Sequence, residues 1–262
     1  MSEVLIARDG PVVTATLNRP ARRNAMNSAL VAALDGLLAG LAADRSARVL
    51  VLTGAGGHFC AGLDLGEVGD QDGDEATRLA AQLDRNRRTG ERFAALSALP
   101  QVVIARIEGS VFAGGLGFVC GADIAIASAE ARFAAPETRR GLVPAQILPW
   151  MVRRMGRAGA TRMVLEGRTL AAAEAQAAGL VHQVAADAAA LDAAVAASIG
   201  DILQGSPLAL AETKRLLAAL GPVAPAGYAE AGAAAFSACA TGPEAREGIL
   251  AFQQKRKPTW AQ

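Results

Sequence analysis

Short apolar runs separated by turn-forming residues fill the first half of the chain, a pattern typical of β-strands. Residues 3–8 and 11–17 are two such runs, and Asp9-Gly10-Pro11 between them predicts the turn of a hairpin. The same pattern predicts buried strands at 49–54 (VLVLTG), 102–107 (VVIARI), 123–128 (DIAIAS) and around Phe133. The front of the chain is therefore predicted to be rich in β-structure.

Helices are predicted between these strands and over most of the second half. Ser28 is a candidate N-cap for an Ala- and Leu-rich helix that ends near Ala43, and an amphipathic helix is predicted over 74–98, before Pro100. From residue 145 to residue 257 the composition is helical, apart from glycine breaks and one short strand predicted at 180–184. A β-rich front and a helical back indicate an α/β protein.

The composition supports a large core and excludes several classes of protein. Of the 262 residues, 52% are hydrophobic and 19% are charged, which argues against disorder and for one α/β domain, alone or with a helical appendage. Lys and Arg number 26 against 25 Asp and Glu, so the basic surplus expected of a nucleic-acid binder is absent, and no charged membrane surface is expected as a partner. The longest uncharged apolar stretch, residues 109–122, is too short to span a bilayer.

Cysteine and histidine are scarce, which argues against metal and disulfide chemistry. The three Cys, at positions 60, 120 and 239, form no CxxC pair, and His58 and His182 are the only imidazoles in the sequence. A structural zinc site is not expected, and a reducing compartment suits this pattern. The first ten residues do not resemble a secretory signal, so we expect a cytoplasmic protein.

Two glycine-rich loops follow predicted strands, at Gly54-Ala-Gly-Gly and Gly114-Gly-Leu-Gly. A dinucleotide site is not favoured, because residues 58–66 do not continue as a clear helix and Asp123 stands only six positions after Gly117. Backbone amides of two such loops can instead form an oxyanion hole, with a short helix beginning at Gly114. The spacing alone leaves a second interpretation equally open, in which the glycines serve only close helix packing.

Several segments, taken together and in order, resemble the enoyl-CoA hydratase/isomerase (crotonase) superfamily. They are HFCAGLDL at 58–65, IEGSVFAGGLGF at 107–118, DIAIASAEARFAAPETRRGLVP at 123–144 and GRTLAAAEAQAAGLVHQV at 167–184. The ends, LNRPARRNAMN at 17–27 and EGILAFQQKRKP at 247–258, resemble the family's first and last signatures. The resemblance implies a spiral of ββα turns over residues 1–200. Residues 201–262 would form a helical region that covers the active site and completes a homotrimer, or a hexamer made of two trimers.

The resemblance also implies roles for particular residues. The two oxyanion amides would belong to Leu63 and Gly114, and Glu137 stands at the position of the family's second catalytic glutamate. Gly117 stands where the first glutamate would be, one helical turn beyond Gly114, and is predicted to leave space beside the thioester and no proton carrier. If Glu137 lies in an apolar pocket, its pKa should rise and allow proton transfer near neutrality.

Binding of coenzyme A is implied at a further set of positions. Arg22, with Arg23 beside it, resembles the basic residues that the family offers to the CoA phosphates. The backbone of Ala61, Leu63, Asp64 and Leu65 would hold the adenine and the pantetheine amides, with Asp64 fixing the loop. Phe252 and Lys255 would reach a neighbouring subunit's CoA. This chemistry needs no metal, flavin or nicotinamide, because coenzyme A arrives as part of the substrate.

Three functions remain open at this point. Hydration of a 2-enoyl-CoA is our first choice, and residues 139–156 most resemble enzymes that hydrate branched, glutaconyl-type thioesters. Isomerisation of a 3-enoyl-CoA to a 2-enoyl-CoA also needs only one base. In the third case the protein binds acyl-CoA without catalysis.

A few other polar residues have weaker claims to a role. His58 is expected to pack against the loop, and Cys60 to be a small buried residue because no His/Asp pairing accompanies it. One of the acidic residues Glu67, Asp70, Asp72 and Asp74 could replace the missing carboxylate.

Overall fold

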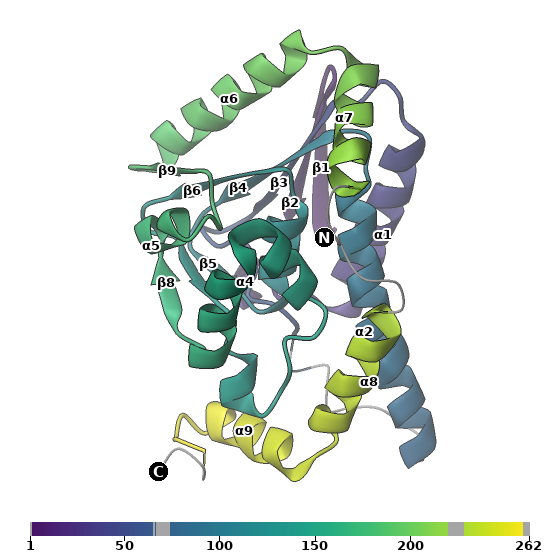
Figure 1. Cartoon of the computed structure of the whole chain (residues 1–262), viewed down its shortest axis with the longest axis vertical. Helices are drawn as coiled ribbons and strands as arrows, with labels where there is room; N and C mark the ends of the chain where they lie inside the picture. Colours follow the sequence, from purple (N-terminus) through teal and green to yellow (C-terminus); the bar gives the residue numbers. More distant parts are fainter. Residues whose placement is uncertain (1, 65, 67–73, 220–227, 259–262) are drawn as a thin grey trace.

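The computed structural model describes residues 2–64, 66, 74–219 and 228–258 and contains two sheets (Figure 1). The larger sheet contains, in spatial order, β1 (Val4–Asp9), β2 (Val12–Leu17), β3 (Val49–Gly54), β4 (Val102–Ile107), β6 (Ile124–Ser128) and β9 (Gln183–Ala185). The smaller sheet contains β5 (Ser110–Phe112), β7 (Arg132–Ala134) and β8 (Thr169–Ala171). Only the β1–β2 and β7–β8 pairs are antiparallel.

Helices connect and cover these strands. The longer ones are α1 (Ser28–Ala43), α2 (Glu75–Ser97), α4 (Leu148–Glu166), α6 (Ala188–Gln204), α7 (Pro207–Ala219), α8 (Tyr228–Ala240) and α9 (Pro243–Gln253). The shorter ones are α3 (Gly114–Gly121), α5 (Ala172–Ala177) and the 3-10 turns η1 (Pro20–Arg22) and η3 (Glu137–Arg140). Because β5 follows β4 and β7 follows β6, the chain alternates between the two sheets. The predicted α/β class is confirmed, and the alternation between the sheets agrees with the predicted spiral of ββα turns.

The central strand β3 shows why the larger sheet holds the core. Leu50 and Leu52 face a large cluster that includes residues of α1, α3 and α4. Val49 and Val51, which alternate with them, pack on the opposite face against Leu191 and other residues of α6. The strand is therefore buried on both faces, as its continuous apolar sequence requires.

Two predictions of local structure need correction. The N-cap of α1 is Asn27, whose side chain accepts a hydrogen bond from the Leu30 amide at 2.9 Å, while Ser28 is the first helical residue. Asn and Ser cap helices about equally well, so two adjacent candidates could not be separated by sequence. The strand predicted at 180–184 lies at Gln183–Ala185, because Leu180 and Val181 belong to the buried turn after α5.

Partly buried basic side chains fix the C-terminal helices to the sheet. The guanidinium of Arg48 donates to carbonyls at the end of α6, including that of Leu203 at 3.1 Å. The ammonium of Lys214 on α7 contacts the Asp123 carboxylate at 2.6 Å. The helix α6 runs continuously across residue 200, where the expected division of the chain lies. Beyond it, α8 packs along α2 and α9 packs on η3 (Figure 1).

Among the described residues, none of the helices is long and apolar enough by itself to cross a membrane. One pair bent by 104°, Ala188–Gln204 with Pro207–Ala218, passes a test of length and composition.

Candidate active site

The segment around Cys60, after the first glycine-rich loop, meets the segment around Val111, before the second. Cys60 pairs with Val111: the Cys60 amide donates to the Ser110 carbonyl at 3.0 Å, and the Phe112 amide donates to the Cys60 carbonyl at 2.9 Å. Gly62 then has a φ of +90°, and a Cβ on it would lie 2.9 Å from the Phe112 oxygen. Only glycine fits this close approach without strain. The backbone that precedes Leu63 is therefore held directly against the segment that precedes Gly114.

The amides of Leu63 and Gly114 are the free donors of this junction. Met26 pairs with the first loop through its own amide, which donates to the Gly62 carbonyl at 2.7 Å, and through its carbonyl, which accepts from the Asp64 amide at 3.0 Å. Among the described residues, no acceptor pairs with the N–H of Leu63 or Gly114. Gly114 begins α3, so its amide is one of the donors that a helix cannot satisfy internally. Such a pair of amides can bind the oxygen of a polarised carbonyl.

Both residues border a cavity of about 660 Å³ that also contains Glu137. Of the residues predicted to bind this chain's own coenzyme A, Arg22, Ala61, Leu63 and Asp64 line it too. Phe252, which was predicted to reach a neighbouring subunit's CoA, lines the cavity of its own chain instead. Lys255 does not line this cavity, and its predicted contact with a neighbouring subunit's ligand stays a prediction. Leu65 lies outside the described residues. Helices α8 and α9 contribute Phe236, Ile249 and Phe252, so the C-terminal helices form part of the wall.

Glu137 has the location and the raised pKa that a proton carrier needs. It begins η3 directly after Pro136, and the residue is only 9% exposed. Burial raises its pKa to about 7, although its own backbone amide and the charge of Arg140 act in the opposite direction. Its Oε2 atom is buried without a hydrogen-bond partner. The carboxyl group therefore exchanges a proton near neutrality and has an acceptor position free for a substrate or a water molecule.

The space predicted beside Gly117 is filled. A Cβ on Gly117 would lie 2.2 Å from the Cζ atom of Phe93, a fully buried residue of α2. The Phe93 ring also packs edge to face on Phe118, with ring centroids 5.2 Å apart. The protein itself therefore fills the space that we expected to be open beside the thioester. A benzyl group from another helix occupies the place, which the sequence pattern around Gly117 could not reveal.

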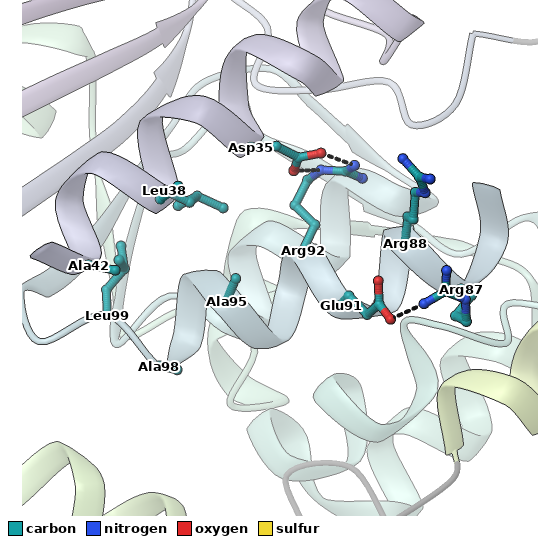
Figure 2. Close-up of a pocket in the computed structure, with 11 residues that line it drawn as sticks. Asp35, Leu38, Ala42, Arg87, Arg88, Glu91, Arg92, Ala95, Ala98 and Leu99 are labelled. Carbon is teal, nitrogen blue, oxygen red and sulfur yellow. Dashed lines mark hydrogen bonds and ion pairs between the residues drawn. The ribbon is translucent and has the colours of Figure 1, made fainter. Parts of the chain in front are cut away.

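An ion pair on the outer side of α2 fixes the helix that carries Phe93. Arg92 is 4% exposed, and its guanidinium contacts the Asp35 carboxylate of α1 at 2.6 and 2.8 Å (Figure 2). Figure 2 shows the pair in a separate groove between α1 and α2, of about 580 Å³. None of the residues that line this groove was predicted to be catalytic. Its contribution is to hold α2 in place, so that the next residue, Phe93, points into the core.

Contacts around the remaining predicted residues agree with supporting roles. Asp64 accepts from Arg19 at 2.8 Å, so it fixes the loop as predicted. The Nδ1 atom of His58 accepts from the Ser110 amide at 3.2 Å, which confirms the packing role. Cys60 is fully buried, and burial raises the pKa of its thiol to about 12. Asp74 caps α2, while Glu67, Asp70 and Asp72 lie outside the described residues.

Sequence reasoning missed several residues of the cavity, among them Met26, Arg140 and Gln146. Arg140 lies three positions after Glu137 on η3, and its guanidinium carbon stands 4.4 Å from the centre of the Phe252 ring. Gln146 donates to Asn86 of α2 and to the Ala229 carbonyl of α8, both at 3.0 Å, and so joins those two helices. The apolar and basic composition of 139–147 gave no signal of which side chains face the cavity. Among the described residues, no cluster of three His, Cys, Asp or Glu side chains that could hold a metal ion occurs.

Comparison with known proteins gives matches along the whole chain. A model of the enoyl-CoA hydratase/isomerase family matches residues 8–262. The chain is 36% identical over 260 residues to a 2,3-dehydroadipyl-CoA hydratase of Escherichia coli, covering 98% of both proteins. It is 34% identical over 255 residues to a mevalonyl-coenzyme A hydratase of Beauveria bassiana, covering 95% of this chain and 91% of that protein.

Solved structures agree with these matches. A putative enoyl-CoA hydratase from Mycobacterium avium paratuberculosis superposes with a TM-score of 0.87 at 36% identity, covering 99% of both chains. Pseudomonas aeruginosa AtuE has a TM-score of 0.79 at 42% identity, covering 99% of this chain and 100% of that one.

Proposed function

Since this chain belongs to the enoyl-CoA hydratase/isomerase family, we propose that it adds water to a 2-enoyl-CoA thioester with Glu137 as the catalytic carboxylate. The observation that carries the proposal is one cavity that borders both unpaired amides, of Leu63 and Gly114, and the buried, unpartnered carboxyl of Glu137. The dehydroadipyl-CoA and mevalonyl-CoA hydratases among the relatives support water addition.

The two amides would stabilise the negative charge that develops on the thioester oxygen. Attack at C3 of a 2-enoyl thioester moves electron density through C2 to that oxygen, which becomes an enolate. Two preorganised N–H groups favour the enolate over the neutral carbonyl, and one such donor is typically worth about 3 to 4 kcal/mol. Both donors belong to backbone, so the side chain of Leu63 is free to contact the substrate.

One carboxyl group can carry both proton transfers of hydration. The Glu137 carboxylate accepts a proton from water while the water oxygen bonds to C3 and the C2–C3 double bond becomes the enolate. The protonated Glu137 then returns that proton to C2, and the carbonyl re-forms. The product gains one water and the enzyme is restored. A pKa of about 7 suits both halves of this cycle, because neither protonation state is strongly disfavoured.

The acyl group we propose is a branched, glutaconyl-type chain. Coenzyme A binds through Arg22 and the 61–65 loop, and Lys255 remains the candidate for contact with a neighbouring subunit's coenzyme A. Resemblance of residues 139–156 to hydratases of such thioesters supports this choice. Because Phe93 occupies the space at Gly117, the acyl chain lies elsewhere in the cavity, toward Ile147, Phe236 and Ile249.

Two alternative functions make different predictions. An isomerase would use the same enolate but would move the Glu137 proton between two carbons, so the product would keep its mass. A non-catalytic acyl-CoA-binding protein would give neither product. The amides and the perturbed carboxyl favour a catalyst over a binding protein, and the hydratase relatives favour water addition over isomerisation.

Mass-resolved turnover of a panel of CoA thioesters tests the proposal. The panel contains 2-enoyl, 3-enoyl and branched glutaconyl-type thioesters, each given to wild type, Glu137→Gln and Glu130→Gln. Glu130 is a matched control, because its side chain is 88% exposed. A gain of one water mass that disappears only in Glu137→Gln supports the one-glutamate hydratase. A double-bond shift without mass change establishes the isomerase, and no turnover of any thioester leaves the binding protein.

The assembly and location are proposals too. We propose a homotrimer, or a hexamer of two trimers, in the cytoplasm. Large apolar side chains that are more than half exposed, such as Leu208, Leu216 and Leu217 on α7, support an interface with further copies. The mass of the particle in solution tests this directly.

A further inference from the structure

Two adjacent arginines on η3 have opposite environments. Arg139 points away from the cavity and donates to the Glu166 carbonyl at the end of α4, at 3.1 and 2.7 Å. Arg140 lines the cavity. Among the described residues, its guanidinium forms no salt bridge and no hydrogen bond, although the charge of Glu137 acts on it from a distance. A partly buried cation without a hydrogen-bonded anion is costly, so this side chain calls for an explanation.

Helix α9 holds Arg140 from two sides. A Cβ on Gly248 would lie 2.5 Å from the Arg140 carbonyl oxygen, so the absence of a side chain there lets the helix contact the backbone of η3. Phe252, four residues later on the same face of α9, stacks on the guanidinium at 4.4 Å. Stacking occupies the face of the planar group and leaves its N–H edge unused. Both contacts hold the Arg140 side chain in place, and neither provides an acceptor for the N–H groups of its guanidinium.

The acyl-CoA substrate is the best candidate to supply the anion that would pair with Arg140. Burial lowers the pKa of Arg140 although the charge of Glu137 acts in the opposite direction, so the guanidinium is poorly solvated where it stands. A carboxylate matches the fork of an arginine in geometry and in charge, and the pair is strongest where water is excluded. The CoA phosphates are poor candidates, because the whole pantetheine arm separates them from the thioester that Glu137 must reach. Arg140 is only one turn of 3-10 helix from Glu137, roughly 6 Å along the axis.

We propose that Arg140 binds a carboxylate at the far end of the acyl chain, and that it selects acid-terminated acyl-CoA thioesters over neutral ones. Arg140 would be a specificity-determining residue and Phe252 its positioning residue. The inference rests on the proposed function only in requiring that the acyl group occupies this cavity. Whether water is then added or a double bond is moved does not affect it.

Binding of unreactive ligands tests the inference apart from catalysis. The probes are two saturated acyl-CoA thioesters of equal length, one ending in a carboxylate and the other in the isosteric carboxamide, and calorimetry gives the two Kd values. We expect wild type to bind the acid about 10- to 100-fold more tightly than the amide, as charge-assisted hydrogen bonds commonly provide. Arg140→Met should abolish the preference, Arg140→Lys should keep part of it, and the control Arg139→Met should keep all of it.

Three other patterns of Kd values would overturn the inference. Equal Kd values in wild type would mean that Arg140 recognises no acyl carboxylate. Equal weakening of both ligands in Arg140→Met would assign the guanidinium to coenzyme A or to the fold. A preference that survives in Arg140→Met would belong to another residue. If Arg140→Met does not fold, the wild-type ratio and the partial preference of Arg140→Lys carry the test. Loss of turnover in Glu137→Gln with no acid preference would leave the proposed function standing and this inference refuted.

Discussion

Two carboxylates would face each other at positions 117 and 137 in a two-glutamate site. Here the two positions have opposite polarity. At 117 a glycine of α3 is covered by the ring of Phe93, in a fully apolar contact. At 137 a carboxyl group is buried, and one of its oxygens has no hydrogen-bond partner. The first position contributes close packing. The second carries a desolvated acid whose pKa is about 7.

The two positions affect the stability of the fold in opposite directions. Apolar packing at Gly117 stabilises the fold, because a large aromatic ring is buried without any polar group. A buried ionised carboxylate destabilises it unless the group is paired or protonated. Glu137 is neither paired nor fully protonated at neutral pH, and the proton transfer that we propose for it would account for this cost. The four predictions below separate the two positions.

The largest expected effect is on the rate, at position 137. Replacing Glu137 by Gln keeps the shape of the side chain but removes the group that accepts and returns a proton. We expect kcat for water addition to fall by about 10²- to 10⁴-fold, with KM changed much less. The wild-type kcat/KM should also rise tenfold per pH unit up to about pH 7, because the carboxylate form is the base, and this rise should be absent in the variant.

Steady-state kinetics across pH, with the exposed Glu130→Gln variant as control, provides the measurement. A wild-type profile that stays flat between about pH 5 and 8 would show that another group transfers the proton. The same conclusion would follow if Glu137→Gln kept more than a tenth of the wild-type kcat.

The next effect is on packing, at position 117. Gly117→Ala places a methyl group within 2.2 to 2.5 Å of the Phe93 ring, so we expect a loss of about 1 to 3 kcal/mol in the free energy of unfolding. Phe93→Ala alone should lose about 3 to 5 kcal/mol, because it leaves a cavity. In the double variant the added methyl group has room, and the combined loss should be smaller than the sum. Denaturant unfolding of the four proteins gives the interaction energy, and strict additivity would mean that the ring does not limit position 117.

The third effect is the loss of stability that the buried Glu137 carboxylate causes, and the size of this loss depends on pH. The pKa of the carboxyl is 4.5 in the unfolded chain and about 7 in the folded protein, so the unfolded chain loses its proton first as the pH rises. Wild type is therefore destabilised progressively between about pH 4.5 and 7, whereas Glu137→Gln is not. The variant should match wild type near pH 4 and exceed it by about 3 kcal/mol near pH 8. A constant difference across this range would contradict the perturbed pKa.

Most of the fold could be predicted from sequence, because apolar runs and glycine turns are local signals. The strands at 102–107 and 124–128 and the short helix at Gly114 lie where the pattern indicates. The contents of the site were harder, because they depend on contacts between distant segments. No local signal connects Phe93 with Gly117, and nothing in the run Arg139-Arg140 tells which guanidinium faces the cavity. Glu137 was predictable only through the resemblance of its surrounding motif to a family.

The smallest effect concerns the backbone just before Gly114 and just before Glu137. Ala113, just before Gly114, has a φ of +50° and a ψ of −122°, which is strained for a residue with a side chain. Pro136, just before Glu137, has a negative φ of −89°. The strain turns the chain so that the Gly114 amide begins α3. Ala113→Gly removes about 1 to 2 kcal/mol of strain, and the greater freedom of glycine in the unfolded chain offsets about half of it. We therefore expect the unfolding free energy to rise by up to about 1 kcal/mol and kcat to stay within about twofold. If kcat instead falls tenfold or more while stability rises, the methyl group of Ala113 itself positions the Gly114 amide. Ala113 would then lower stability in favour of catalysis, as we propose for Glu137.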